Sequence, residues 1–336
     1  MESLEIKTVE MHTGGEPVRI VVSGMPPIIG KTIIEKMNYI RDNLDYIRKM
    51  LMNEPRGHSD MFGVILVEPD TPEADLGCIF IHNGGYATMC GHVSIAVGRY
   101  AVDYGIVKNL KSPETEVTLQ CPCGLVKMYV EYSNGKSGIT IFKSVPAYVY
   151  QLDLEIIVPG FGTTTVDISY GGGFYAVLSA SKLGLDLTTS SVEKLKDAGE
   201  AVKDAVNKSL KLTHPEGSDL AFMFGVILTD GNDEFSDEPT TQVSVFGHRQ
   251  VDRSPCGSGT TARVAQQIKR GYMKLNQQRK YQSVIGSVFT GEAIQEVKYG
   301  PYDAVIVKIS GRSYKTGTSV YTVETDDETG KGFLLS

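Results

Sequence analysis

The hexapeptide MFGVIL occurs twice in this 336-residue chain, at positions 61–66 and 223–228. A glycine-rich turn that leads into an apolar strand also occurs twice, at 15–23 (GEPVRIVVS) and 171–179 (GGGFYAVLS). The copies lie about half a chain apart, far beyond the roughly 20–50 residues of a solenoid repeat. A chain of this length has room for about two domains. The repeat therefore predicts one domain-sized unit used twice.

Each half follows the same predicted order of secondary structure. Strands come first, then a polar segment of helical period, then the MFGVIL strand; the strands lie at 18–22 and 175–178, and the polar segments at 31–52 and 191–211. A cysteine then precedes an apolar helix that ends at a glycine, with Cys90 before Gly105 and Cys256 before Gly271. This order predicts a mixed α/β (α+β) fold.

The predicted domain boundary lies near the middle of the chain. We expect an N-terminal subdomain over residues 1–150 that carries Cys90, and a C-terminal subdomain over 151–317 that carries Cys256. An extended, apolar segment between two prolines marks the crossing near residue 150. A C-terminal strand at about residues 318–336 would complete the first subdomain.

Composition limits the partners and the compartment. The formal net charge is −7, from 33 Lys and Arg against 40 Asp and Glu, and the charges are scattered. This balance argues against nucleic acid or an anionic membrane as a partner. The N-terminus lacks an apolar signal region and no run of about 18 apolar residues occurs, so we expect a cytoplasmic protein. The hydrophilic segment DGNDEFSDEP at 230–239 is expected to be a solvent-exposed hairpin tip.

The equivalent positions of Cys90 and Cys256 predict a chemistry. Two copies of a domain normally pack about a pseudo-twofold axis, and small ligands bind in clefts between domains. Two thiols on opposite sides of one ligand can invert a stereocentre, because one removes a proton and the other returns one to the opposite face. A helix N-terminus lowers the pKa of a thiol from about 8.5 and so favours the thiolate. We therefore predict that these two cysteines form a catalytic acid and base pair.

The same helix starts predict how the ligand is held. Backbone N–H groups at the N-terminus of a helix commonly bind anions. Those of Gly91, His92, Gly257 and Ser258 can therefore hold a carboxylate. Asp252, in the loop before the second helix, is the candidate partner for an amine.

The remaining motifs predict neither a metal nor a cofactor. Five cysteines are too few and odd in number for a disulfide framework, so reduced thiols are expected. Cys78 lies in an apolar strand and is expected in the core. Cys121 and Cys123 lack a second pair, or histidines, at ligand spacing, which argues against a metal site. The glycine-rich strings do not match a dinucleotide fingerprint.

Four strings together resemble the proline racemase family, in order and over essentially the whole chain: MHTGGEP (11–17), EPRGHSDMFG (54–63), MCGH (89–92) and DRSPCGSGT (252–260). The resemblance implies two pseudo-symmetric subdomains of the diaminopimelate-epimerase-like fold, each a curved, mostly antiparallel sheet around a central apolar helix. It also implies a homodimer that exchanges the α-proton of proline or a hydroxyproline, with no pyridoxal phosphate and no metal.

The resemblance also separates branches of the family. Proline racemases and 4-hydroxyproline 2-epimerases carry cysteine at both catalytic positions, whereas trans-3-hydroxy-L-proline dehydratases have Thr or Ser at one. This chain has both thiols. Phe62 and Phe246 resemble the apolar wall of the racemases, where an unpartnered ring hydroxyl would cost roughly 1–3 kcal/mol. We therefore predict a racemase that interconverts L- and D-proline.

Other hypotheses stay open at this stage. The strings CPCGLV, DRSP and EPRGHSDM resemble the dehydratases, so both 4-hydroxyproline epimerisation and 3-hydroxyproline dehydration are alternatives. A protein that binds an amino acid without turnover is an alternative of a different class. Thiol-based acyl transfer needs a histidine base for one cysteine, and His92 lies only two residues from Cys90, so we rank it below the others.

Overall fold

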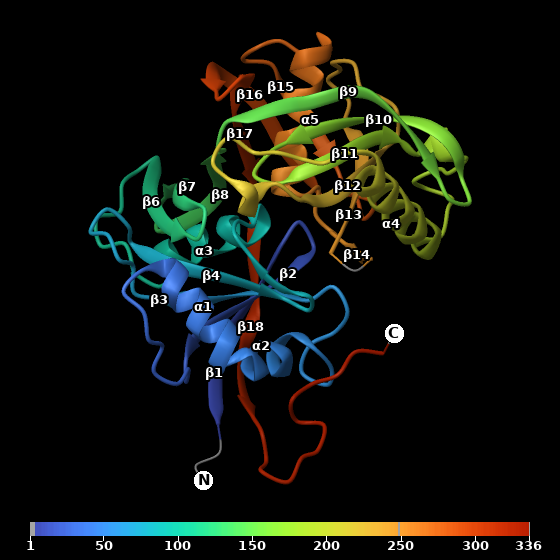
Figure 1. Ribbon diagram of the computed structural model, residues 1–336. Helices are drawn as coiled ribbons and strands as arrows, with labels where there is room; N and C mark the ends of the chain where they lie inside the picture. The colour runs from blue at the N-terminus through green and yellow to red at the C-terminus, as the bar shows by residue number, and fades with distance from the viewer. Residues whose placement is uncertain (1–3, 248, 336) are drawn as a thin grey trace. The chain divides into compact units, whose positions relative to one another are not determined.

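The computed structural model describes residues 4–335 apart from residue 248, and it has a mixed α/β fold (Figure 1). The chain forms two compact units. Unit 1 contains the residues up to Phe142 together with those from Arg312 onward, and unit 2 contains Lys143–Gly311. The predicted limits at 150 and 317 fall inside strands β9 (Ala147–Val158) and β18 (Ser313–Thr322). Sequence alone does not show which strands pair, and both strands pair along their length within one unit.

The described residues of unit 1 form one sheet and three helices. Its elements are β1 (Glu5–Thr13), β2 (Glu16–Ser23), α1 (Ile33–Asn43), α2 (Asp45–Met52), β3 (Phe62–Val67), β4 (Leu76–His82), β5 (Gly85–Ala87), α3 (Gly91–Asp103), β6 (Glu114–Cys121), β7 (Gly124–Ser133), β8 (Lys136–Lys143) and β18. Figure 1 shows β18 beside β1, with which it pairs in antiparallel register. The last strand of the chain therefore completes the sheet that the first strand begins.

Unit 2 repeats the plan of unit 1. Its elements are β9, β10 (Gly162–Tyr170), β11 (Phe174–Ser179), the short helix η1 (Ala180–Leu183), α4 (Val192–Ser209), η2 (Ser218–Leu220), β12 (Met223–Thr229), β13 (Thr240–Phe246), β14 (Gln250–Val251), α5 (Gly257–Arg270), β15 (Gln278–Gln282), β16 (Val288–Tyr299) and β17 (Tyr302–Gly311). The sheet closes on itself, because β17 pairs with β9 as well as with β16.

The two units share one succession of strand pairings. In unit 1 the pairs β1–β2, β3–β4, β6–β7 and β7–β8 are antiparallel, while β2–β3 and β4–β6 are parallel. In unit 2 the equivalent parallel pairs are β11–β12 and β13–β15. A parallel pair needs a crossover connection, usually a helix. Helices α3 and α5 provide the second crossover of each unit, and each follows one of the two cysteines.

Helix α3 is the apolar centre of unit 1. It packs against β1, β2, β3, β6, β7 and β18, and eleven of its thirteen residues are buried. In unit 2, α5 packs against β9, β10, β11, β16 and β17. A helix surrounded in this way is fixed along its whole length, so the position of its first residue is fixed too.

The helix expected over residues 31–52 is interrupted. It forms as α1 and α2, which meet at Leu44. A capping box starts α1, because the Thr32 side chain accepts from the Glu35 N–H while the Glu35 carboxylate accepts from the Thr32 N–H. The segment expected over 191–211 forms a single helix, α4, with Ser191 as its N-cap.

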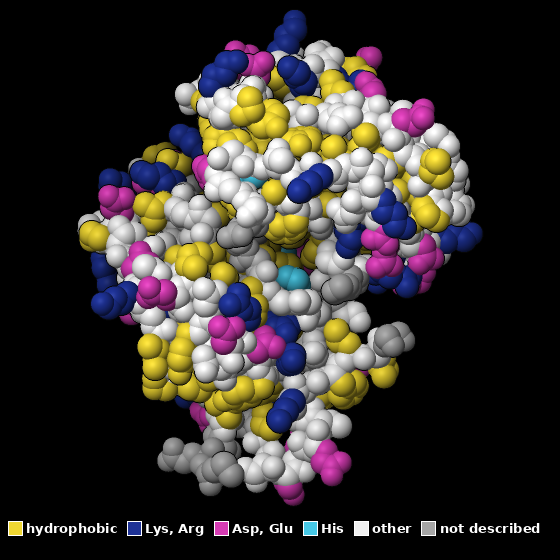
Figure 2. All heavy atoms as spheres, viewed as in Figure 1, with side chains coloured by type: hydrophobic (Ala, Val, Ile, Leu, Met, Phe, Trp, Pro, Cys, Tyr) yellow, Lys and Arg dark blue, Asp and Glu magenta, His cyan; other side chains and the backbone are white. Residues whose placement is uncertain are grey.

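The surface carries mixed charge. On the face shown in Figure 2, basic and acidic side chains are interspersed among polar and apolar ones. Across the described part of the chain, no helix combines the length and the hydropathy that crossing a bilayer requires.

Candidate functional site

Cys90 lies at the N-cap of α3, with its side chain against a histidine. Its backbone is extended (φ −144°, ψ 113°) and the residue is buried. The Sγ atom lies 3.2 Å from His92 Nδ1 and 4.0 Å from Nε2. Gly91 and His92, both buried, are the first two residues of the helix. The predicted carboxylate-binding N–H groups of unit 1 therefore lie next to the thiol.

His92 is a neutral neighbour for this thiol. Burial lowers the pKa of His92 to about 3, and a backbone hydrogen bond with Pro17 only partly opposes that shift. Thr13 Oγ1 donates to the His92 carbonyl at 2.8 Å and fixes the first turn of the helix. An imidazole with so low a pKa can exchange a hydrogen bond with the sulfur but is a poor acceptor for its proton at neutral pH. This counts against acyl transfer with His92 as the base.

Phe62 lines the same part of unit 1. It is the first residue of β3 and is 2% exposed. Its ring meets the His92 ring edge to face, with centroids 5.0 Å apart, and stacks on His82 at 5.1 Å. The predicted aromatic wall residue is therefore in contact with the histidine that contacts the Cys90 thiol.

Cys256 occupies the N-cap of α5 in a different conformation. Its φ of +66° lies in the region that residues other than glycine rarely adopt. Sγ accepts a hydrogen bond from Gly259 N–H at 3.4 Å, and the Tyr175 hydroxyl lies 3.6 Å from it. A Cβ at Gly259 would lie 3.0 Å from the sulfur, so a larger residue there would press on the thiol. A strained backbone such as that of Cys256 is typical of functional positions.

Two hydroxyl groups lie together at this thiol. Tyr175, fully buried on β11, and Ser258, the second residue of α5, share a hydrogen bond of 2.7 Å between their oxygens. Ser258 Oγ is 3.9 Å from Cys256 Sγ. Gly257 is the first residue of the helix and is buried. The sulfur therefore has the Gly259 N–H and the hydroxyl groups of Tyr175, Ser258 and Ser244 beside it.

Burial and a neighbouring carboxyl group set the protonation of Cys256. The pKa of this thiol is raised to about 12, first by burial and then by the charge of Asp252, against smaller effects of Tyr175 and the Gly259 N–H. The Gly259 N–H at the helix start lowers this pKa as expected, but burial and Asp252 outweigh it, so the expectation that the thiolate is favoured is wrong for Cys256. Asp252 is itself buried, and burial raises its pKa to about 6 although Oδ1 accepts from Ser254 N–H at 2.8 Å.

Two aromatic residues that the sequence analysis did not single out, Phe224 and Tyr175, lie near Phe246 in unit 2. Phe246, at the end of β13 and 4% exposed, stacks on Phe224 with centroids 5.6 Å apart. Phe224 in turn contacts the ring of Tyr175 at 5.5 Å. In the repeated MFGVIL, Phe224 occupies the step of Phe62, so the repeat itself held the signal for it. Tyr175 occupies the step of Arg19 in the other repeat, and no sequence signal marked it.

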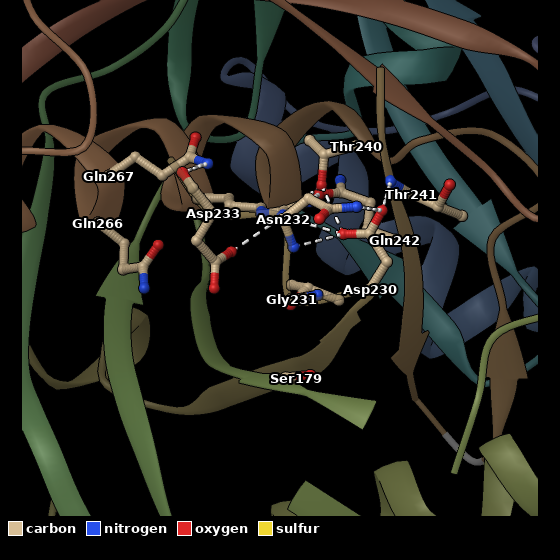
Figure 3. A network of polar contacts seen from close by, with 12 residues as sticks. Ser179, Asp230, Gly231, Asn232, Asp233, Thr240, Thr241, Gln242, Gln266 and Gln267 are labelled. Carbon is tan, nitrogen blue, oxygen red and sulfur yellow. Dashed lines mark hydrogen bonds and ion pairs between the residues drawn. The ribbon is translucent and has the colours of Figure 1, made fainter. Parts of the chain in front are cut away.

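The loop at 230–239 is anchored rather than simply solvated. It joins β12 to β13 as a hairpin connection and most of its side chains are exposed. Within the network of Figure 3, Asp230 accepts from the N–H groups of Asn232 and Thr241, at 3.0 and 2.7 Å. The fully buried Arg263 side chain donates to Asp233 at 3.0 Å.

This network reaches the segment before Cys256. Arg263 also donates to Gln242 Oε1 at 3.0 Å, and Gln242 Nε2 donates to the carbonyl of Pro255 at 2.5 Å. The Thr260 hydroxyl donates to the same carbonyl at 3.0 Å. These bonds fix the carbonyl that immediately precedes Cys256, so the loop helps to hold the strained cysteine in place.

The structure places the predicted residues in two groups. Cys90, Gly91, His92 and Phe62 form one group in unit 1. In unit 2, Asp252 lies in the loop before Cys256, Gly257 and Ser258, and Phe246 is connected to this group through the rings of Phe224 and Tyr175. Cys78, expected in the core, is fully buried on β4. Among the described residues, no group of three or more His, Cys, Asp or Glu side chains is arranged to hold a metal ion.

Comparisons with known proteins agree with the motifs. A family profile described as proline racemase matches residues 8–334. A trans-L-3-hydroxyproline dehydratase of Saccoglossus kowalevskii is 53% identical over 97% of this chain and 100% of its own. A proline racemase of Acetoanaerobium sticklandii is 41% identical over 98% of each chain. The crystal structure of a hydroxyproline epimerase from Agrobacterium vitis, with bound trans-4-hydroxy-L-proline, superposes with a TM-score of 0.90 at 28% identity, covering 100% of this chain and 96% of that one.

Proposed function

The chain belongs to the proline racemase family, and we propose that it dehydrates trans-3-hydroxy-L-proline with Cys90 as the base. The observation that carries this proposal is the identity of 53% to a dehydratase over nearly the whole of both chains, against 41% to a racemase. Racemisation of proline, which the two thiols and the aromatic residues Phe62 and Phe246 favoured in the sequence, thereby becomes the second candidate, because these few positions are weaker indicators than similarity along the whole chain.

The proposed reaction breaks the bond from the α-carbon to its hydrogen and the bond from carbon 3 to its hydroxyl, and it leaves the ring closed. The Cys90 thiolate takes the proton from the α-carbon, and the electrons of that bond form a double bond to carbon 3 as the bond from carbon 3 to the hydroxyl breaks. The hydroxide leaves with a proton as water. Cys256, whose pKa is raised to about 12, carries its proton at neutral pH and can supply it. The enamine product tautomerises to the ring imine.

The backbone and Asp252 would hold the substrate. N–H groups at the first residues of α3 and α5 have no partner within their own helix and favour an anion, so they suit the carboxylate. Asp252 is buried beside Cys256 and its pKa is raised to about 6. A positively charged amine against it would favour its ionised form and offset the cost of burial. That both groups serve one substrate is part of the proposal, as are the homodimer and the cytoplasmic location implied by the resemblance.

Cysteine at both catalytic positions favours a second activity, racemisation or epimerisation. The dehydratases that the sequence resembles have Thr or Ser at one catalytic position, whereas this chain has cysteine at both. Two thiols can exchange the α-proton with inversion, so racemisation of proline or 2-epimerisation of a hydroxyproline is the second candidate. The two activities share the first step and differ in the fate of the carbanion.

One set of incubations separates these functions. The protein is incubated in heavy water with trans-3-hydroxy-L-proline, L-proline or trans-4-hydroxy-L-proline, and the products are followed by NMR and chiral chromatography. Imine from the 3-hydroxy substrate supports dehydration; α-deuterated D-proline or the epimer supports the second candidate. If calorimetry shows binding but neither the imine nor an inverted product forms, both proposed activities are contradicted and the hypothesis of a non-catalytic binding protein remains.

A further inference from the structure

Three cysteines that the proposed reaction does not use lie together in unit 1. Strands β4 and β6 pair in parallel, with Gly77 opposite Gln120. The next residues along the two strands are Cys78 and Cys121. Neighbouring positions in paired strands direct their side chains to the same face of the sheet. The two thiols therefore lie side by side, and both residues are fully buried.

Cys123 is the third member and the most accessible one. Cys121 pairs with Gly124 at the start of β7, so Cys123 lies in the two-residue turn between them. Side-chain hydrogen bonds join the Cys121 thiol to those of Cys123 and Cys78, and they raise the pKa of Cys121 well above its usual value. Cys78 and Cys121 are buried, whereas Cys123 is partly exposed. An oxidant in solution therefore reaches this cluster at Cys123.

The turn is also connected to the segment that carries Cys90. The backbone N–H of Cys123 donates to the carbonyl of Thr88 at 3.2 Å. Thr88 follows β5 and lies two residues before Cys90. A change of backbone conformation at Cys123 would therefore act on the approach to the N-cap of α3.

We propose that Cys121 and Cys123 are a site of reversible thiol oxidation, at which hydrogen peroxide produces a disulfide across the turn. Peroxide oxidises the Cys123 thiol to a sulfenic acid and is reduced to water. The Cys121 sulfur then attacks the Cys123 sulfur, the S–OH bond breaks, and the hydroxyl leaves with the Cys121 proton as a second water. A thiol reductant reverses the reaction.

The spacing of Cys121 and Cys123 along the chain is compatible with a disulfide. Two Cα atoms separated by one residue are at most about 7 Å apart, close to the upper limit of about 6.8 Å for a disulfide. The disulfide can therefore form with a small adjustment of the turn. Because Cys123 N–H holds Thr88, that adjustment would displace the segment before Cys90. The bond itself does not depend on the proposed function, whereas its effect on turnover does.

The test combines mapping of the disulfide with activity. The whole protein is treated with hydrogen peroxide, alkylated, digested and analysed by mass spectrometry. We expect the peptide that contains Cys121 and Cys123 to lose two hydrogens and to regain them with dithiothreitol. A bond between Cys78 and Cys121, or sulfonic acid at Cys123 without a disulfide, would overturn the proposal.

A matched variant separates this site from the catalytic cysteines. Cys123→Ser changes a partly exposed residue and should leave basal activity intact. In the parent protein we expect turnover to fall roughly tenfold on oxidation and to recover with reductant, since a displacement of about 1 Å can cost up to about 100-fold. The variant should resist this reversible loss. Equal loss in both proteins would mean that Cys90 or Cys256 is the oxidised residue. If the parent has no turnover on any of the three substrates, the proposed function fails while the mapping still decides the disulfide.

Discussion

Cys90 and Cys256 occupy the same step of a duplicated fold, yet their surroundings differ. Cys90 has an ordinary extended backbone and a neutral histidine 3.2 Å from its sulfur. Cys256 has a strained backbone, one N–H and three hydroxyl groups near its sulfur, and a buried carboxyl group that raises its pKa. The two halves of the fold therefore supply equivalent positions, and the neighbours of Cys256 raise the pKa of its thiol. In the proposed reaction we assign the base to Cys90 and the acid to Cys256.

The residues beside the two cysteines, His92 and Asp252, make stability depend on pH in opposite directions. Burial lowers the pKa of His92 from 6.5 to about 3, so the unfolded chain binds this proton more readily and stability falls as pH drops below about 6.5. Burial raises the pKa of Asp252 from 3.8 to about 6, so the folded chain binds this proton more readily. The contribution of Asp252 to the free energy of unfolding is therefore complete below about pH 3.8, and it is lost as pH rises through about 6.

The largest expected effect is that of Cys90→Ser. Loss of the base should reduce both dehydration and racemisation by roughly 10²- to 10⁴-fold, because a positioned general base contributes about that much. Turnover of all three candidate substrates is measured, with Cys123→Ser as the control for removal of a thiol elsewhere in unit 1. Dehydration that persists in Cys90→Ser would refute the assignment of the base.

Cys256→Ser should divide the two activities. Serine can still donate a proton to a leaving hydroxide but is a far weaker acid and base towards carbon. We expect proline racemisation to fall by roughly 10²-fold or more while dehydration falls by less than about tenfold. The ratio of imine to inverted product is measured on the same sample. If both activities fall to the same extent, the two thiols do not have separable roles.

Asp252→Asn should raise the free energy of unfolding but weaken substrate binding. The variant removes a carboxyl group whose pKa is raised to about 6, while Asn can still accept from the Ser254 N–H. One pKa unit corresponds to about 1.4 kcal/mol, so the free energy of unfolding at pH 7 should rise by up to about 3 kcal/mol. The gain should vanish towards about pH 4, where the parent carboxyl group is protonated. Urea unfolding across this pH range checks it.

The same variant tests the role of Asp252 in binding. Without the carboxylate, KM should rise for every substrate with a secondary amine. In the parent protein KM should rise as pH falls below about 6, since the carboxylate is then protonated. A variant that is less stable than the parent at pH 7 would contradict the argument from burial. An unchanged KM would contradict the role of Asp252 in binding the amine.

The sequence predicted the local backbone around the two cysteines better than the electrostatics of the candidate site. The repeat and the glycines beside each cysteine identified Cys90, Cys256 and both helix starts, because these features depend on local backbone geometry. Tyr175 was missed because its counterpart in the other repeat is a buried arginine paired with Glu10. The raised pKa of Cys256 was also missed, since burial depends on strands distant in the sequence.

Tyr175→Phe should have the smallest effect, a rise in the pKa of Cys256 with no change at Cys90. The tyrosine hydroxyl lowers the pKa of Cys256 and lies 3.6 Å from its sulfur, so its loss should raise that pKa further. The interaction corresponds to about 1 kcal/mol, or roughly a fivefold decrease in thiolate at a given pH. The rate of alkylation of Cys256 against pH measures this without any substrate. Tyr281→Phe is the matched control, because its buried hydroxyl donates to Gln267 instead, at 2.5 Å. A decrease in Cys90 alkylation to the same extent would show that Tyr175 acts on packing in general rather than on the second thiol, and the difference between the two cysteines would then lie elsewhere.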